Sequence, residues 1–367
     1  MRAFVPFAME RWQSTYENRV AFNLSESGVH PLTLRELASY GDDDVLATLL
    51  GYGQSNGSDP LRAYIAAMYD GADDGNVVLT NGSAEANFVT LWELLPPGGT
   101  VAVYMPTYMQ THHLAQNFGA TVREFWGREE DGWQPDPDEV RSAIDGADLV
   151  VVTNPGNPTG AVLSDASRRA IVDAAASAGA WILADEVYAG AEVAGGPATP
   201  SFWGSYDRVV AVGSLSKAYG LPGLRIGWLE APHELAARLW SRTDFTSIST
   251  GQLTDTLACI ALRPDIRPKI MERARGIIRS NLQVMADWLD RMAVFTYRPP
   301  DAGAIVYARY DMPPESEELA ERLRVEQDLL IVPGAHFAMG KYVRFGFGLP
   351  VEELQAALGR FGQLIGK

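Results

Sequence analysis

The segment Ser214-Leu-Ser-Lys-Ala-Tyr-Gly-Leu-Pro-Gly-Leu-Arg-Ile-Gly227 decides the fold that we expect of this chain. It directly follows the apolar run Arg208–Gly213, which is typical of a buried strand. Only four of the 30 Lys and Arg residues are lysines, and Lys217 is the sole lysine among the first 268 residues. Lysine can form an imine, whereas arginine cannot. The segment therefore indicates a functional amine at a strand end, and the alternative is an ordinary surface lysine in an arginine-rich chain.

Short apolar runs alternate with helical stretches on both sides of this segment. Buried apolar runs separated by helices are typical of a doubly wound α/β domain with a mostly parallel sheet. The predicted strands are Val77–Thr80, Thr100–Tyr104, Leu149–Thr153, Trp181–Ala184 and Arg208–Gly213. The predicted helices are Ala84–Leu95, Met109–Asn117, Ser164–Ala178 and Glu234–Trp240.

Unusual polar residues follow four of these strands. They are the motifs Met105-Pro-Thr-Tyr108, Asn154-Pro-Gly-Asn-Pro-Thr-Gly160, Asp185-Glu-Val-Tyr188 and Ser214-Leu-Ser-Lys217. Ligands of such sheets bind beyond the carboxyl ends of the strands, so the four motifs predict one binding site at one edge of the sheet. Turn-forming residues alone would explain one or two of these motifs, but not all four.

A smaller α+β domain should follow the doubly wound one. Apolar residues recur at helical spacing from Ile270 to Leu289 and predict a connecting helix. We assign residues 31–250 to the large domain, and residues 1–30 and 251–367 to the small domain with its connecting helix. The predicted elements of the small domain are strands Ala304–Ala308, Leu329–Val332 and Tyr342–Phe347, and helices Ser316–Arg324 and from Val351 to the end.

Composition excludes several functional classes. The formal net charge of −16 argues against nucleic acid or an anionic membrane as a partner. The chain has no apolar stretch long enough to span a membrane and no signal peptide. Its single cysteine, Cys259, cannot form an internal disulfide, which favours a cytoplasmic location. The five histidines form no metal-binding pattern, so we expect no metal.

Taken together, the motifs resemble those of the class I/II aminotransferases of fold type I, which use pyridoxal 5′-phosphate (PLP). The resemblance extends from Tyr52 to Arg344 in the order of the family, and the segment around Lys217 fits the family's lysine signature at every fixed position. It implies a fold type I PLP-transferase that forms a homodimer. It also implies that Lys217 binds PLP covalently and carries the proton between Cα of the substrate and C4′ of the cofactor.

The same resemblance implies roles for further residues. Asp185 would pair with the pyridine nitrogen, and Tyr188 and Asn157 would hydrogen-bond O3′ of PLP. Tyr108 would stack on the ring, although it could instead be a core tyrosine. The predicted phosphate-binding residues are Gly82, Ser83, Ala84, Ser214, Ser216 and Arg225, joined by Tyr52 from the neighbouring subunit. Free N–H groups at a helix N-terminus suit an anion of this kind.

The substrate side of the site is less defined. Arg344 matches the family's arginine that binds the substrate α-carboxylate, and the alternative is a structural strand arginine. Gly28 would line the substrate wall, where a glycine permits close approach. Asn157, already expected to bind the cofactor, is also expected to contact the substrate. His30 could contact the substrate or only cap the segment before Pro31. Glu26, His112 and His113 are candidates for binding the substrate side chain.

The resemblance leaves the reaction open. We expect an aminotransferase that acts on an α-amino acid with a 2-oxo acid acceptor. The stretch Ser27-Gly-Val-His30 and the lysine segment are locally similar to the capreomycidine synthase branch, whose members cyclise a hydroxyarginine. A β/γ-elimination, replacement or cyclising enzyme is therefore the alternative, because these PLP enzymes share their early steps. A non-enzymatic aminotransferase-like regulator is a third reading, which the acidic charge makes unfavourable.

Overall fold

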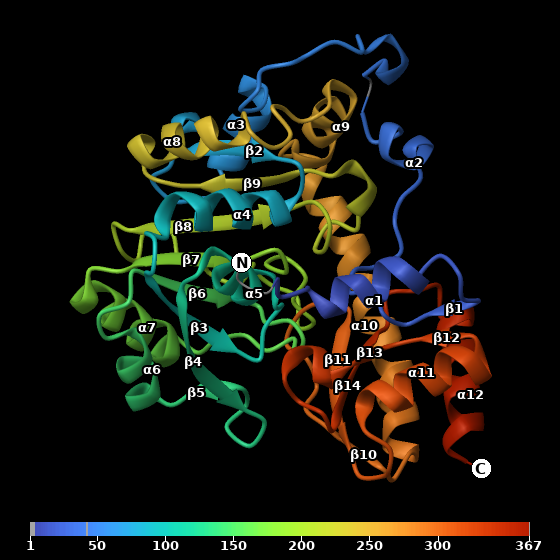
Figure 1. Cartoon of the computed structure of the whole chain (residues 1–367). Coiled ribbons are helices and arrows are strands. Elements are labelled where there is room, and N and C mark those ends of the chain that lie inside the picture. Colours follow the sequence, from blue (N-terminus) through green and yellow to red (C-terminus); the bar gives the residue numbers. More distant parts are fainter. Residues whose placement is uncertain (1–3, 42, 367) are drawn as a thin grey trace.

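A central eight-stranded sheet organises the chain. The computed structural model describes residues 4–41 and 43–366 (Figure 1). The strand order in the large sheet is β2-β9-β8-β7-β6-β3-β4-β5. These strands are β2 (Val77–Thr80), β3 (Thr100–Met105), β4 (Thr121–Arg128), β5 (Gln134–Pro135), β6 (Leu149–Thr153), β7 (Trp181–Asp185), β8 (Val209–Ser214) and β9 (Gly227–Glu230). The expected mostly parallel α/β architecture is confirmed.

Both edges of the large sheet depart from the parallel pattern. At one edge β5 is antiparallel to β4. The strands β8, β7, β6, β3 and β4 run parallel to one another, whereas β9 is antiparallel to both β8 and β2. The segment Gly227–Glu230 was not predicted as a strand. This strand, β9, begins at Gly227, the last residue of the lysine segment. It lies between β8 and β2 and is antiparallel to both.

Helices cover both faces of the large sheet because alternate strand residues point to opposite sides. Val101 and Val103 of β3 pack with α4 (Ser83–Leu94), α5 (Gln110–Phe118) and α8 (His233–Thr243). Ala102 and Tyr104 point the other way, into the core formed with α6 (Pro137–Ile144) and α7 (Asp165–Ala178). The sheet is therefore buried on both faces, which explains the near-continuous apolar runs of its strands.

A second, four-stranded antiparallel sheet lies in the C-terminal part of the chain. Its order is β10-β11-β14-β13, with β10 (Phe295–Tyr297), β11 (Ile305–Tyr310), β13 (Val332–Pro333) and β14 (Tyr342–Gly346). The predicted strand Leu329–Val332 is wrong as one element. Its first half is β12 (Leu329–Leu330), which pairs in parallel with β1 (Phe22–Asn23), whereas Val332 belongs to β13. One apolar run thus serves two sheets.

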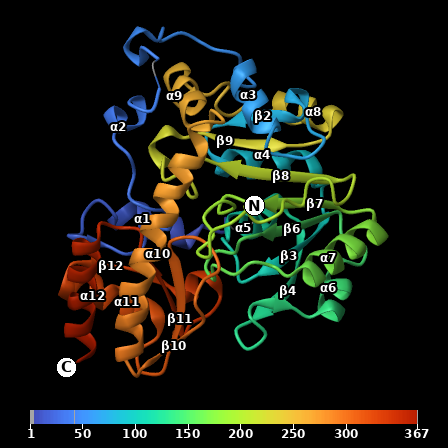
Figure 2. The same ribbon diagram turned by 180° about the vertical axis from the view of Figure 1, so that it is seen from behind.

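A long helix connects the two sheets. The helix α10 (Arg267–Arg291) runs from beside α9 (Gln252–Leu262) to the four-stranded sheet, as both views show (Figures 1 and 2). Pro268 lies in its first turn, where the missing N–H costs nothing. The remaining α-helices of the described residues are α1 (Ala8–Tyr16), α2 (Leu34–Ala38), α3 (Asp59–Ala66), α11 (Ser316–Gln327) and α12 (Val351–Ile365).

The packing of α9 bears on the predicted division into domains. This helix packs against α3 and α2, which precede the large sheet in the chain. Residues 1–3, 42 and 367 of the predicted division lie outside the described residues, and the boundaries at residues 30 and 250 stay a prediction.

Among the described residues, no helix has both the length and the apolar character needed to cross a membrane.

Candidate active site

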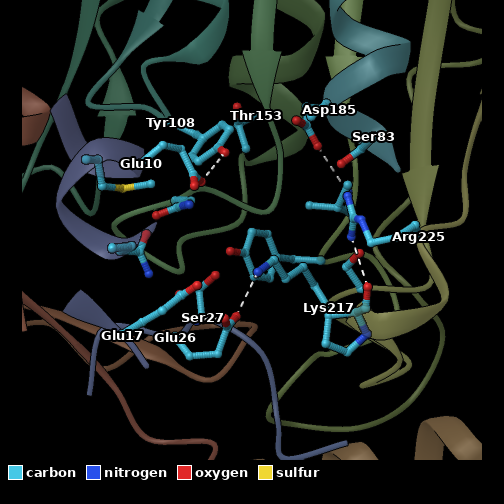
Figure 3. A pocket seen from close by; sticks show the side chains of 18 residues that line it. Glu10, Glu17, Glu26, Ser27, Ser83, Tyr108, Thr153, Asp185, Lys217 and Arg225 are labelled. Atoms are coloured by element: carbon cyan, nitrogen blue, oxygen red, sulfur yellow. Dashed lines mark hydrogen bonds and ion pairs between the residues drawn. The ribbon is translucent and has the colours of Figure 1, made fainter. Parts of the chain in front are cut away.

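A cavity of about 350 Å³ opens between the large sheet and the N-terminal segment. Strand ends of the large sheet supply one wall, because β6, β7 and β8 all present their carboxyl ends to it. The helix α1 and the segment after β1 supply the facing wall (Figure 3). Nine of the predicted site residues line the cavity: Ser83, Ala84, Tyr108, Asn157, Asp185, Tyr188, Ser216, Lys217 and Arg225.

The amine of Lys217 reaches into this cavity and is paired there with a carboxylate. The Nζ of Lys217 lies 2.9 Å from Oε1 of Glu26. Burial alone would lower the pKa of Lys217, but the charge of Glu26 and the nearby Tyr188 hold this pKa above its usual value. The same ion pair lowers the pKa of Glu26 to about 2. The carboxylate opposite Lys217 thus reverses the effect that burial has on the pKa of this lysine.

Asp185 is buried at the end of β7 and is held by a neighbouring helix. Asn87 of α4 donates from Nδ2 to Oδ2 of Asp185 at 3.0 Å. Burial raises the pKa of Asp185, and the hydrogen bond from Asn87 lowers it in part. The resulting carboxyl group lines the cavity without an ion-pair partner among the described residues. Such a group suits a cationic atom of a bound ligand.

Two tyrosines contribute to the cavity in different ways. The hydroxyl of Tyr188 is buried and has no hydrogen-bond partner among the residues that the structure describes. A buried polar group without a partner is rare, so this hydroxyl is available to a ligand. The hydroxyl of Tyr108 donates to Oε1 of Glu10 at 2.6 Å, while its ring lies edge-on to Phe7 with 4.9 Å between centroids.

The opposite end of the cavity could hold an anion. The first turn of α4 presents Ser83 and Ala84 there, beside the guanidinium of Arg225. A Cβ on Gly82 would overlap that guanidinium, and Gly82 has φ of 83°, so only glycine fits this position. Ser214 lies behind the wall, where its hydroxyl is 2.9 Å from that of Ser216.

Arg344 is buried beside the cavity, with only 1% of its surface exposed. Its Nη1 donates to Oδ1 of Asn157 at 2.8 Å, and its Nη2 donates to the backbone oxygen of Ser25. The Nε of Arg344 has no partner among the described residues. Arg344 thus links β14 to the Asn157 loop, and one donor of its guanidinium remains unused.

Three further predicted residues lie outside the cavity lining. Gly28 lies against Lys217, since a Cβ on it would be 3.8 Å from Cδ of Lys217 and 3.2 Å from the Ser216 oxygen. His30 is not brought to the cavity; its Nδ1 lies 3.1 Å from Nη2 of Arg273, a contact that explains its position structurally. Tyr52 is 87% exposed and contributes nothing to the cavity of its own chain.

The facing wall contains residues that sequence reasoning missed. Glu10, Gln13 and Glu17 all line the cavity. Glu10 and Gln13 lie on α1 and Glu17 directly follows it. Their helical spacing puts them on one side of the chain, but nothing local in the sequence places that side at the cavity. Asn87 was also missed, although it is one turn inside a helix whose start was recognised. Of the three side-chain candidates, Glu26 lines the cavity, whereas His112 pairs with Glu124 and His113 is not in the lining.

Comparison with known proteins gives consistent results. The family model described as "Aminotransferase class I and II" matches residues 32–361. The chain is 32% identical to capreomycidine synthase of Streptomyces vinaceus, over 98% of this chain and 93% of that protein. It is 27% identical to the aspartate/prephenate aminotransferase of Thermus thermophilus, over 79% of this chain and 75% of that protein.

A solved structure extends the similarity to the whole fold. The PLP-dependent aminotransferase of Streptococcus suis 89-1591 superposes with a TM-score of 0.92 at 32% identity, covering 100% of this chain and 98% of the other. Because the family model spans most of the chain and both relatives and fold agree with it, the chain belongs to the class I and II aminotransferases, enzymes of fold type I that use PLP.

Proposed function

We propose that the protein is a PLP-dependent aminotransferase that transfers the amino group of an α-amino acid to a 2-oxo acid. The observation that carries this proposal is the placement of Lys217, Asp185 and Arg225 around one cavity. An amine, a carboxylate and a guanidinium there match an aldehyde, a ring nitrogen and a phosphate of a single cofactor. No other described cavity combines a lysine with such partners.

The cavity's unsatisfied groups fit PLP. The free hydroxyl of Tyr188 suits O3′, together with Asn157. The first turn of α4, with Ser83 and Ala84, suits the phosphate along with Arg225. We assign Gly82, Ser214 and Ser216 to the same phosphate site, because Gly82 makes room for the guanidinium and the two serines brace each other.

Each catalytic side chain then has one task. PLP, when bound, withdraws electrons from the substrate carbon and makes its Cα–H bond acidic. Asp185 keeps a proton on the ring nitrogen, which strengthens this withdrawal. Lys217 takes the proton from Cα and delivers it to C4′. Tyr108 covers the ring and excludes water, and Arg344 orients the substrate by its α-carboxylate.

The charges of the cavity favour a substrate with a cationic side chain. Figure 3 shows Glu10, Glu17 and Glu26 grouped at the end away from Arg225. Burial and the charges of Glu26 and Glu10 raise the pKa of Glu17, which has no hydrogen bond or ion pair from its side chain to another described residue. An ammonium or guanidinium group would relieve this repulsion. The attraction of this acidic end for a cationic side chain also fits the guanidino substrates of the capreomycidine synthase branch.

A half-reaction tests the proposal. Purified enzyme loaded with PLP is mixed with single amino acids, and the visible absorbance of the lysine-bound cofactor is followed. Transamination predicts that this band disappears as the amino form of the cofactor accumulates, and that a 2-oxo acid restores it. Release of ammonia and a 2-oxo acid, with the visible band unchanged after each turnover, would contradict transamination.

A β/γ-elimination, replacement or cyclising reaction is the second candidate. It is favoured by the 32% identity to capreomycidine synthase over nearly the entire chain. The discriminating measurement uses a β-hydroxylated arginine and product analysis by mass spectrometry. Loss of water without transfer of nitrogen to an added 2-oxo acid would establish this second reaction in place of the first.

We also propose that the enzyme is a cytoplasmic homodimer. Leu46, Leu49, Leu50 and Tyr52 are 90%, 82%, 88% and 87% exposed, respectively. A row of apolar side chains this exposed is typical of an interface with another chain. A second copy covering them would bring Tyr52 to the partner's phosphate site, as the family resemblance implies.

A further inference from the structure

The carboxylate of Glu26 is fixed in place by contacts within the chain. Its Oε1 accepts hydrogen bonds from the backbone N–H groups of Ser27 and Gly28, at 2.8 and 3.2 Å. Lys217 donates to the same atom at 2.9 Å. Three donors on one oxygen hold the carboxylate rigidly. The carboxylate of Glu26 is therefore held in one orientation, toward Lys217, and does not rotate freely within the cavity.

Other charges around this pair do not replace Glu26. Charged or titratable groups face Lys217 and Glu26 from α1, β7 and its following loop, and β14; they are Glu10, Glu17, Asp185, Tyr188 and Arg344. Arg344, the one cation among them, is engaged with Asn157 and Ser25. Glu26 thus depends on Lys217 for its counter-charge, and Lys217 depends on Glu26.

We propose that Glu26 is a positioning residue for proton transfer, which orients the amine of Lys217 and stabilises the ammonium that forms when Nζ takes up a proton. This inference rests on the proposed function. When Lys217 acts as a free amine, the Cα–H bond breaks, an N–H bond forms on Nζ, and the electron pair passes to the bound cofactor. Glu26 stays ionised throughout and stabilises the ammonium that results, so the proton remains on Nζ until it is delivered.

The first test measures Lys217 directly in the full chain without PLP. With lysine labelled at ¹³Cε, the protein gives four lysine signals, and the Lys217→Arg variant identifies the one of interest. We expect the Lys217 signal of the wild type to remain that of an ammonium to a higher pH than an ordinary lysine does. In Glu26→Gln, the main effect that opposes burial is removed, so the signal should titrate at least about one pH unit lower than in the wild type.

Two further variants make this test specific. Glu17→Gln makes the same chemical change in the same cavity but on a side chain with no hydrogen bond to Nζ, so it should move the Lys217 titration far less. Glu26→Asp keeps the charge and should restore part of the wild-type behaviour. An identical Lys217 titration in wild type and Glu26→Gln would overturn the proposal.

The second test concerns the loaded enzyme. Exchange of the substrate Cα proton in D₂O, followed by NMR, requires the neutral lysine. The pH at which this exchange becomes half-maximal should fall by about one unit or more in Glu26→Gln. An unchanged profile would overturn the role in proton transfer. Failure of PLP to give a lysine-bound band would instead reject the proposed function, an outcome that the cofactor-free NMR titration distinguishes.

Discussion

Asn87 of α4 and Asp185 of β7 are joined by a hydrogen bond of 3.0 Å between Nδ2 and Oδ2, although 98 positions separate them in the chain. This contact opposes the effect of burial on Asp185, whose pKa is raised. Removing the amide should raise this pKa further. The ionised fraction of Asp185 would then decrease as the pH falls, and the cofactor's ring nitrogen would lose its partner.

Asn87→Ala should therefore weaken PLP binding, and more at pH 6 than at pH 8. A hydrogen bond to a charged group contributes about 1.5–3 kcal/mol, which corresponds to roughly 10- to 100-fold in Kd. Titration of the cofactor-free protein with PLP at several pH values measures this. Asn117→Ala is the control, because among the described residues the Asn117 side chain is hydrogen-bonded only to the backbone of Val5. Equal affinity of Asn87→Ala and wild type would refute the assigned role of Asp185.

Lys217→Ala should abolish turnover and the covalent bond to PLP while leaving the fold intact, because Lys217 is the only lysine among the described residues that line the cavity. Borohydride reduction followed by mass spectrometry of peptides locates the bond in the wild type. Lys269→Ala removes an exposed lysine and should retain the adduct. An adduct that persists on another residue of the Lys217→Ala protein would disprove the assignment.

Arg344→Lys should raise KM for the amino acid much more than it lowers kcat. Arg344 gives Nη1 to Asn157 and Nη2 to Ser25 and keeps Nε for a carboxylate, an arrangement that a lysine cannot reproduce. Loss of such a buried charged contact costs about 2–5 kcal/mol. Steady-state kinetics give the split between KM and kcat, and circular dichroism checks the fold, since Arg344 also binds Asn157. Arg309→Lys on the neighbouring strand β11, half-exposed, is the matched control.

Ionisation of the buried Glu230 side chain should lower the free energy of unfolding as the pH rises. This side chain is fully buried, neither carboxylate oxygen has a hydrogen-bond partner among the described residues, and burial raises its pKa from 4.5 to about 8. The folded state therefore binds this proton more tightly than the unfolded state. The resulting stability is present below pH 4.5 and is lost as the pH rises through about 8.

Glu230→Gln should consequently stabilise the protein at pH 8–9 and flatten this loss. Gln cannot ionise, so it avoids the cost of burying a charge at this pH. One pKa unit corresponds to about 1.4 kcal/mol, so a gain of about 1 kcal/mol or more is expected. Thermal unfolding at pH 5 and pH 9 measures the difference, with Glu321→Gln on the exposed face of α11 as control. A melting temperature of Glu230→Gln below that of wild type at pH 9 would contradict this account.

Charge at positions 49 and 50 should separate the subunits of the proposed dimer. The double variant Leu49→Glu and Leu50→Glu places carboxylates on the two exposed leucines and should have the mass of a monomer in light scattering. Its affinity for PLP should also fall, because Tyr52 would no longer reach the partner. Val325→Glu changes another exposed apolar residue, on α11, and should remain dimeric. A wild type that is monomeric at micromolar concentration would end the dimer proposal.

The sequence predicts the strands of the large sheet well because these strands are buried on both faces. Their apolar runs have no polar face to obscure them: Leu149–Thr153 is the same element in the sequence and in the structure. The strand β4, in contrast, mixes exposed and buried side chains and was not identified. The strand β9 was missed because Gly227 also ends the lysine segment, where glycine indicates a turn.

The candidate site divides in the same way. Its cofactor side follows from motifs at strand ends, which are local in sequence. The facing wall does not, because Glu10 and Glu17 approach Lys217 only after distant segments pack together. Contacts between distant segments could not be predicted from the sequence. Two of them are the ion pair of Glu26 with Lys217 and the contact of His30 with Arg273.

The pairing of β1 with β12 has a consequence for synthesis on the ribosome. Phe22 and Asn23 leave the exit tunnel early, yet their strand partners, Leu329 and Leu330, are translated about 300 residues later. Domains generally fold as the nascent polypeptide emerges, and long-range pairings form last. The wall that presents Glu26 to Lys217 can therefore be completed only after Leu329 and Leu330 have left the ribosome.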